Sequence, residues 1–284
     1  MRAKETLKAV GALVVFYVAV LAVAFPIMVA VALVSDGGVT TVALSFGSLV
    51  IAALVVYALL LRMGWATEQM FRWPGAGSRR VRLAFRGFLV GALVGGLMAA
   101  GALTLAVVTR SAEVSLTGEP VTRLLVPAGS LALLLLVAAL AEELLFRGYP
   151  LARLSAVFGR VGASLALAIV FALAHLFNPN VSTLGLVNIG LASLVLSAAF
   201  FTPGGLPAAW GVHWGWNAGL GLLVDAPVSG LEFDLPTIDF TPGEPVWLAG
   251  GEFGPEGGLV ATLAMAVTLA WLVHRNAGTM EDRS

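Results

Sequence analysis

Cysteine is absent from the 284-residue chain. Disulfide bonds, thiolate nucleophiles and cysteine-ligated metals are therefore excluded, whereas the redox state of the compartment is left open. Charge is scarce as well: Asp, Glu, Lys and Arg make up 11% of the residues, against about 25% in a typical soluble domain. The 16 basic and 16 acidic residues cancel, so the net charge does not favour nucleic acid or another polyanion as a partner.

Hydrophobic residues, in contrast, make up 59% of the chain, and the mean hydropathy is +0.97. These values indicate an integral membrane protein. We predict an all-α, polytopic bundle of about eight transmembrane helices, with residues 1–284 forming a single integral membrane domain. The predicted spans are 9–34, 41–61, 87–108, one that starts near Leu124 and carries an acidic cluster, 161–177, 182–201, 206–224 and 258–274.

Basic residues are divided unevenly between the two sides of this bundle. Alternate connections, counted from the N-terminus, hold 13 of them, six in the connection 62–86, whereas the opposite connections hold only Arg110 and Arg123. Because Lys and Arg concentrate in cytoplasmic loops, we expect both termini in the cytoplasm and the acidic connection 225–257 outside. The arginines of 62–86 are expected to contact anionic headgroups; the alternative is a substrate-docking surface.

The hydrocarbon run 131–140 leads directly into Glu142, Glu143 and Arg147. Ionisable groups in membrane spans are expensive, and are usually paired and functional. Glu143 and Arg147 are four residues apart and can pair on one helix face. Glu142 points about 100° away from Glu143, so this pair does not neutralise it, and it is a candidate general base. The alternative is an ion-paired plug that holds the bundle together.

Two histidines in later spans are candidates to join Glu142. His175 and Glu142 lie at equal distances along the chain from a turn near 158–160, which predicts similar depths in an antiparallel hairpin. His213 and Asn217 share one face of their helix and offer N–H donors for an oxyanion. The alternatives are a satisfied core histidine at 175 and an interhelical hydrogen bond at 213–217.

Glycines mark the faces on which two of the spans pack. Gly87, Gly91 and Gly95 recur every four residues in the third span. A second set, Gly211, Gly215 and Gly219, lies roughly opposite the face of the seventh span that carries its histidine. Small residues at this spacing let helix backbones approach closely, so both sets are expected to serve packing and not chemistry.

The pattern Glu142-Glu143-x-x-x-Arg147, then Phe171-x-x-x-His175, then His213-x-x-x-Asn217 resembles the motif set of the CPBP (CAAX protease and bacteriocin-processing enzyme, or Abi) family. The stretch 250–258 also resembles bacterial members. The resemblance spans about 142–217, with a motif-bearing protease core of about 124–224, and the first three spans carry no motif of the family.

This resemblance implies a glutamate-dependent intramembrane endopeptidase. In such an enzyme Glu142 activates a water with help from His175, and His213 and Asn217 stabilise the oxyanion. Glu143 and Arg147 would hold the site together, and Glu143 is a further candidate to share in catalysis. The implied location is a prokaryotic plasma membrane, with access to the site from the cytoplasm.

Other intramembrane protease chemistries lack their residues here. The sequence has no His-Glu-x-x-His, and every Asp falls in a loop or tail, so an aspartyl dyad is not available. Gly162-Ala-Ser164 lacks the glycine that follows a serine-protease motif. A metal at Glu142, His175 and His213 is chemically possible, but the expected cofactor and metal content is none.

The predicted function is hydrolysis of peptide bonds in membrane-associated proteins or peptides, with the lipid bilayer as the other partner and no nucleic acid. The competing hypothesis is a non-catalytic membrane protein, for example an immunity, scaffold or proton-coupled transport protein. Buried Glu and His groups also serve proton relays, so the two hypotheses differ in whether a proteolytic product depends on Glu142.

Overall fold

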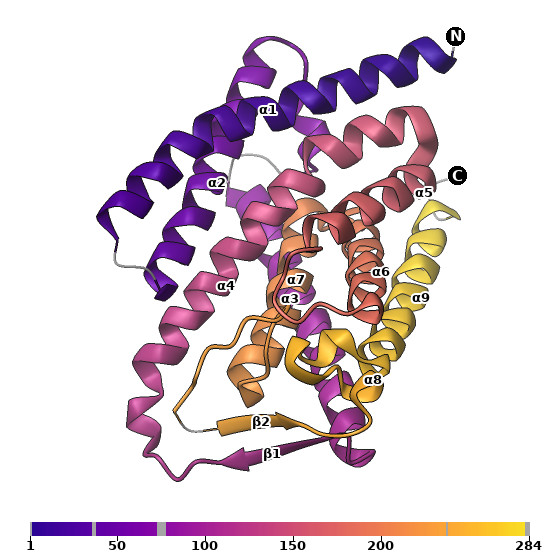
Figure 1. Cartoon of the computed structure of the whole chain (residues 1–284). Coiled ribbons are helices and arrows are strands. Elements are labelled where there is room, and N and C mark those ends of the chain that lie inside the picture. The colour runs from indigo at the N-terminus through magenta and orange to yellow at the C-terminus, as the bar shows by residue number, and fades with distance from the viewer. Residues whose placement is uncertain (1, 36–37, 73–77, 237, 282–284) are drawn as a thin grey trace.

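A computed structural model describes residues 2–35, 38–72, 78–236 and 238–281 (Figure 1). Parts of the expected connections at 35–40 and 62–86 lie outside these residues. The long helices form one bundle in which chain segments far apart in sequence are neighbours. They are α1 (Arg2–Val34), α2 (Gly38–Arg62), α3 (Ser78–Val108), α4 (Leu125–Phe146), α5 (Tyr149–Ala174), α6 (Thr183–Phe200), α7 (Gly205–Val224) and α9 (Leu259–Glu281), with a short α8 at Val246–Ala249.

The predicted helical membrane bundle is confirmed. Six helical segments in the described part of the chain are long and apolar enough to cross a membrane. One of them, Val121–Ala174, contains both α4 and α5, and α7 is not among the six. The glycines, His213 and Asn217 of α7 lower its hydropathy, which explains its omission. The number of eight spans stays a prediction.

The two glycine sets pack against each other. A Cβ at Gly95 of α3 would overlap the Val212 carbonyl oxygen of α7, and a Cβ at Gly215 would overlap the Ala92 carbonyl oxygen. Only glycine permits this approach of the two backbones. The packing fixes the rotation of α7 about its axis, so that its polar face points away from α3.

The end of α4 is held by tyrosines from the first two helices. The Tyr17 hydroxyl donates to the Leu145 carbonyl over 3.1 Å, and the Tyr57 hydroxyl donates to the Leu144 carbonyl. Gly148 leaves room for this contact, since a Cβ there would collide with the Tyr57 hydroxyl. Helices without any family motif therefore support the helix that carries the acidic cluster.

The chain turns twice between α4 and the C-terminal half of α5. Pro150 lies in the first turn of α5, where its fixed φ suits a helix start. A second break follows at Gly159, whose φ is 70°, as the predicted turn near 158–160 requires. Residues 149–158 are helical, however, so α4 and α5 form a bent path and not the simple hairpin that we expected.

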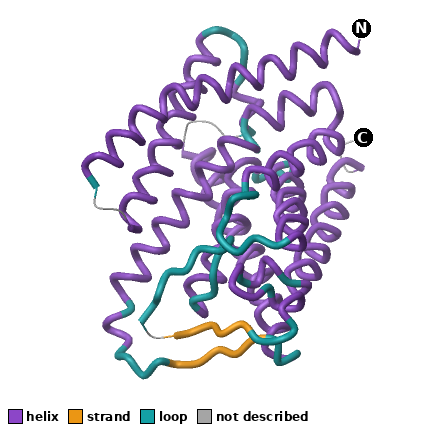
Figure 2. The backbone as a smooth tube through the Cα atoms, in the orientation of Figure 1, coloured by secondary structure: helices purple, strands orange, loops and turns teal. Residues whose placement is uncertain are grey.

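A small antiparallel sheet closes one end of the bundle, although the sequence predicted only loops there. Strands β1 (Ala112–Leu116) and β2 (Ile238–Pro242) pair with Val114 opposite Phe240 (Figure 2). The partners are more than 100 residues apart in sequence, so no local turn signal exists for them. The sheet ties the α3–α4 connection to the acidic connection after α7.

Candidate active site

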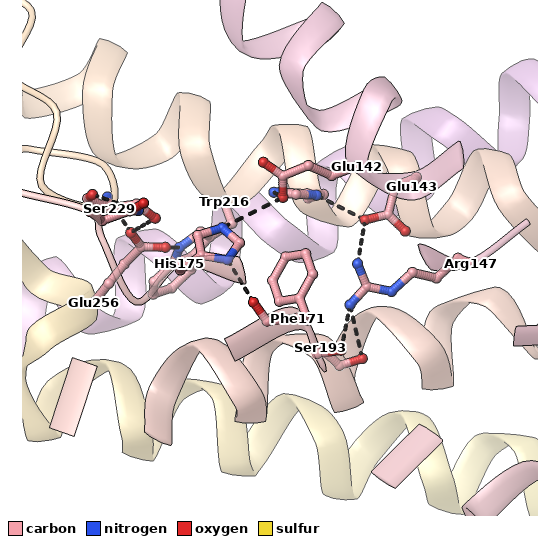
Figure 3. Close-up of polar contacts among 11 residues, drawn as sticks. Glu142, Glu143, Arg147, Phe171, His175, Ser193, Trp216, Ser229 and Glu256 are labelled. Carbon is pink, nitrogen blue, oxygen red and sulfur yellow. Dashed lines mark hydrogen bonds and ion pairs between the residues drawn. The ribbon is translucent and has the colours of Figure 1, made fainter. Parts of the chain in front are cut away.

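Two histidines from different segments converge on one carboxylate oxygen of Glu142. Glu142 Oε2 on α4 lies 3.8 Å from His175 Nε2, at the end of α5, and 3.8 Å from His213 Nε2 on α7. Figure 3 shows Glu142 and His175 in this cluster. Both distances exceed a direct hydrogen bond, so the three groups face a common point. The predicted convergence of Glu142, His175 and His213 is present.

Behind this point lies a fully buried ion pair. Arg147 Nη1 donates to Glu143 Oε1 over 3.1 Å, and neither side chain is exposed. Arg147 Nη2 donates to Ser193 Oγ of α6 over 2.7 Å, and the guanidinium lies 4.4 Å from the centre of the Phe171 ring (Figure 3). The predicted pair therefore also joins α4 to α5 and α6. Ser193 was not among the predicted site residues, because nothing in the local sequence distinguishes it from other helix serines.

The two histidines differ in the partner of Nδ1. His175 Nδ1 lies 2.7 Å from the Phe171 carbonyl oxygen, which can only accept, so this nitrogen carries the proton. His213 Nδ1 lies 2.8 Å from Glu143 Oε1, and a carboxylate partner also stabilises an imidazolium. In its neutral form each ring therefore presents an unprotonated Nε2 towards Glu142.

These groups line a cavity of about 630 Å³. Glu142, His175, His213 and Asn217 are on its wall, together with apolar side chains of α2, α4, α6 and α7. Glu143 and Arg147 are not on the wall and act from behind it. The predicted site residues thus separate into four on the cavity wall and two buried behind it.

A second polar network on the cavity wall was not predicted. The buried Glu256 accepts a hydrogen bond from Trp216 Nε1 over 2.8 Å and from the Ser229 hydroxyl over 2.8 Å (Figure 3). Asn178, three residues after His175, donates to the Ser229 carbonyl over 3.0 Å. This network connects both histidine-bearing segments to the stretch 250–258, whose resemblance to bacterial relatives was the one sequence signal for it.

Beside the 630 Å³ cavity lies a smaller one of about 420 Å³ within the acidic connection, and Glu232 and Phe233 line both. Burial raises the pKa of Asp225 in this second cavity to about 6. The carboxylates of Asp234, Asp239 and Glu232 also raise it, whereas the hydrogen bond from the Leu235 N–H opposes the rise.

Metal binding was tested on the geometry of the possible ligands. Among the residues that the structure describes, no group of three or more His, Cys, Asp or Glu side chains is arranged to hold a metal ion. Glu142, His175 and His213 are therefore not arranged as a metal site.

Residues 124–219 match the family model of the type II CAAX prenyl endopeptidases, described as Rce1-like. The match agrees with the resemblance to CAAX proteases and includes every residue from Glu142 to Asn217. No curated protein and no solved structure matches the chain. The protein is an integral membrane protein, and the match to the Rce1-like family model implies a protease.

Proposed function

We propose that this Rce1-like protein is a glutamate-dependent intramembrane endopeptidase that cleaves membrane-associated proteins or peptides. The observation that carries the proposal is the convergence of Glu142 Oε2 with Nε2 of His175 and of His213, each at 3.8 Å, on the wall of a 630 Å³ cavity. The catalytic core is about 124–224, within a single membrane domain. Both termini are assigned to the cytoplasm of a prokaryotic cell.

In this mechanism a water held between Glu142 and His175 is the nucleophile. A gap of 3.8 Å is bridged well by a water that hydrogen-bonds to both groups. Glu142 takes a proton from the water as its oxygen attacks the peptide carbonyl carbon. The carboxylic acid then returns the proton to the leaving amine as the C–N bond breaks, so that Glu142 acts first as base and then as acid.

His175 and His213 have different parts in this reaction because their Nδ1 partners differ. Neutral His175, whose Nδ1–H donates to a carbonyl, presents Nε2 as an acceptor that orients the water. His213 can donate from Nε2 only as an imidazolium, and the Glu143 carboxylate stabilises that form. His213 and Asn217 then supply the N–H donors for the oxyanion of the tetrahedral intermediate.

The decisive experiment compares membranes from cells that carry wild-type protein or Glu142→Gln. Mass spectrometry of membrane-derived peptides is expected to show fragments that depend on Glu142. The rate of their formation should fall about 10²–10⁴-fold in the variant, as for loss of a general base. Glu113→Gln, which alters an exposed carboxylate of β1, is the matched control. Protein abundance and thermal unfolding are measured for all three.

His175→Ala extends the test. The loss of one imidazole from a cavity of this size leaves space for free imidazole, which should restore part of the cleavage in His175→Ala but none in Glu142→Gln. If both variants keep full cleavage or the full cellular phenotype while they are folded, the non-catalytic hypothesis replaces this one.

A further inference from the structure

The catalytic cavity is built from one end of the bundle. Its lining residues outside the long helices all come from two connections, 175–182 before α6 and 225–258 after α7. They are His175, Asn178, Val228, Ser229, Leu231, Glu232, Phe233 and Glu256. Within the described part of the chain, the connections 63–72 and 201–204 at the other end contribute no lining residue. The cavity therefore leads from Glu142 towards the acidic connection.

Exposure along the cavity wall locates its mouth. The exposed lining residues are Leu231 and Glu232 of the acidic connection, Gly38 and Val42 at the start of α2, and Ala174 at the end of α5. In contrast, Val195, Leu196 and Val212, nearer the other end of α6 and α7, are buried. The mouth thus lies among the first turns of α2, the end of α5 and the segment 231–232.

The opposite end of the bundle is the basic one. Arg72 Nη2 donates to the Phe201 and Thr202 carbonyls in the α6–α7 connection, and Arg160 lies 5.1 Å from the centre of the Phe201 ring. The 20 residues of α7 separate this end from Asp225 by about 30 Å, the thickness of a hydrocarbon core. Lys and Arg concentrate on the cytoplasmic side, which makes the acidic end the outer one.

Two expectations from the sequence therefore conflict. If the termini and arginine-rich connections are cytoplasmic, a cavity that leads to the acidic connection cannot also receive substrate from the cytoplasm. The expected orientation of the bundle rests on 15 Lys and Arg residues outside the span that carries the acidic cluster. The expected access from the cytoplasm rests in part on family resemblance. The charge distribution has the stronger physical basis for this chain.

We infer that the substrate enters the site from the extracytoplasmic side, through the mouth at Leu231 and Glu232. This inference rests on the proposed function. The substrate class is a membrane-associated polypeptide whose cleaved segment is presented on the outer face, instead of a lipid-modified cytoplasmic protein. The connection 225–257 holds seven acidic residues and neither Lys nor Arg, so it disfavours acidic segments at the mouth.

The natural absence of cysteine makes a direct test possible. Single variants Leu231→Cys at the mouth and Arg80→Cys at the basic end are expressed in otherwise unchanged full-length protein. Intact cells are treated with a membrane-impermeant maleimide, before or after permeabilisation. Leu231→Cys is expected to react in intact cells, and Arg80→Cys only after permeabilisation. Wild-type protein, which has no thiol, gives the background.

The reverse pattern, with Leu231→Cys labelled only after permeabilisation, overturns the inference. If Leu231→Cys does not react under either condition, Glu113→Cys replaces it, because Glu113 is exposed on strand β1 at the acidic end of the bundle. Labelling of Glu113→Cys in intact cells supports the inference, and labelling only after permeabilisation overturns it. Labelling does not require activity, so the same measurement in the Glu142→Gln background separates failure of this inference from failure of the proposed function. In the active background, labelled Leu231→Cys should lose at least tenfold in cleavage, whereas labelled Arg80→Cys should not.

Discussion

His213 Nδ1 and Glu143 Oε1 lie 2.8 Å apart, and the same carboxylate oxygen accepts from Arg147. The second glutamate of the Glu142-Glu143 pair therefore contacts a histidine that itself faces the first. Glu143 is fully buried and off the cavity wall, so in the proposed mechanism it acts through the orientation and charge of His213. Its contribution to catalysis can be separated from its contribution to folding.

Glu143→Gln is expected to lower both stability and cleavage. It leaves the Arg147 cation buried without its counter-charge, which costs about 3–5 kcal/mol. Adding Arg147→Met removes that cation and should recover most of the lost unfolding temperature. Cleavage should not recover, because His213 still faces an amide in place of a carboxylate. Thermal unfolding in detergent and cleavage rates measure the two effects. Recovery of both would mean that Glu143 has a structural role only.

Gly95→Ala is expected to lower stability by about 1–3 kcal/mol, as overpacking does. The added methyl group would overlap the Val212 carbonyl oxygen on α7. Gly96→Ala is the matched control, because the nearest atom to the new Cβ, the Gly215 carbonyl oxygen, is 3.9 Å away. It should be neutral or slightly stabilising, since alanine favours helix by up to about 1 kcal/mol. Equal unfolding temperatures for the two variants would contradict this packing.

Glu256 is expected to be a positioning residue for α7. Glu256→Gln weakens the acceptor for Trp216 Nε1 and Ser229 Oγ. Loss of such buried hydrogen bonds costs about 1–3 kcal/mol, and we expect the cleavage rate to fall roughly tenfold. Trp216→Phe removes the indole donor, and the double variant should be little worse than either single one, because both break the same link. Glu252→Gln, an exposed neighbour, is the control. Strictly additive losses would argue against a shared link.

Asp225 should make stability depend on pH. Burial raises its pKa to about 6, whereas the pKa in the unfolded chain is about 4. At pH values between these two, the native state therefore binds more protons than the unfolded state. Stability therefore falls as pH rises through this window. Asp225→Asn should reduce the fall, and asparagine tolerates the left-handed backbone at this residue. Unfolding temperatures at pH 4.5 and pH 7 give the comparison; an unchanged difference in the variant would contradict it.

Removal of metal is expected to leave cleavage unchanged. A zinc ion would need Glu142, His175 and His213 at about 2.0–2.2 Å, and no described group of side chains has a metal-binding arrangement. Dialysis against a chelator, followed by return to chelator-free buffer, tests this. Loss of cleavage that zinc alone restores would identify a metal enzyme.

Local spacing was sufficient for part of the site. The Glu143–Arg147 pair depends only on residues one helical turn apart, and the positions of most long helices follow from long apolar runs. The convergence of Glu142 and His175 was predicted from chain distance to a turn, although the true path contains an additional break at Gly148. The β1–β2 sheet had no such local signal.

The amino-acid sequence was sufficient to predict a membrane bundle, the helices that carry its few ionisable groups and the family motifs among them. Which atoms meet depended on tertiary structure. Glycine contacts with α3 set the rotation of α7, so that His213 contacts Glu143. Glu256 accepts a hydrogen bond from Trp216, which is 40 residues away in sequence. Tertiary structure also decided towards which end of the bundle the cavity leads. Helix length and spacing are local properties, whereas helix rotation and loop closure depend on contacts between distant segments.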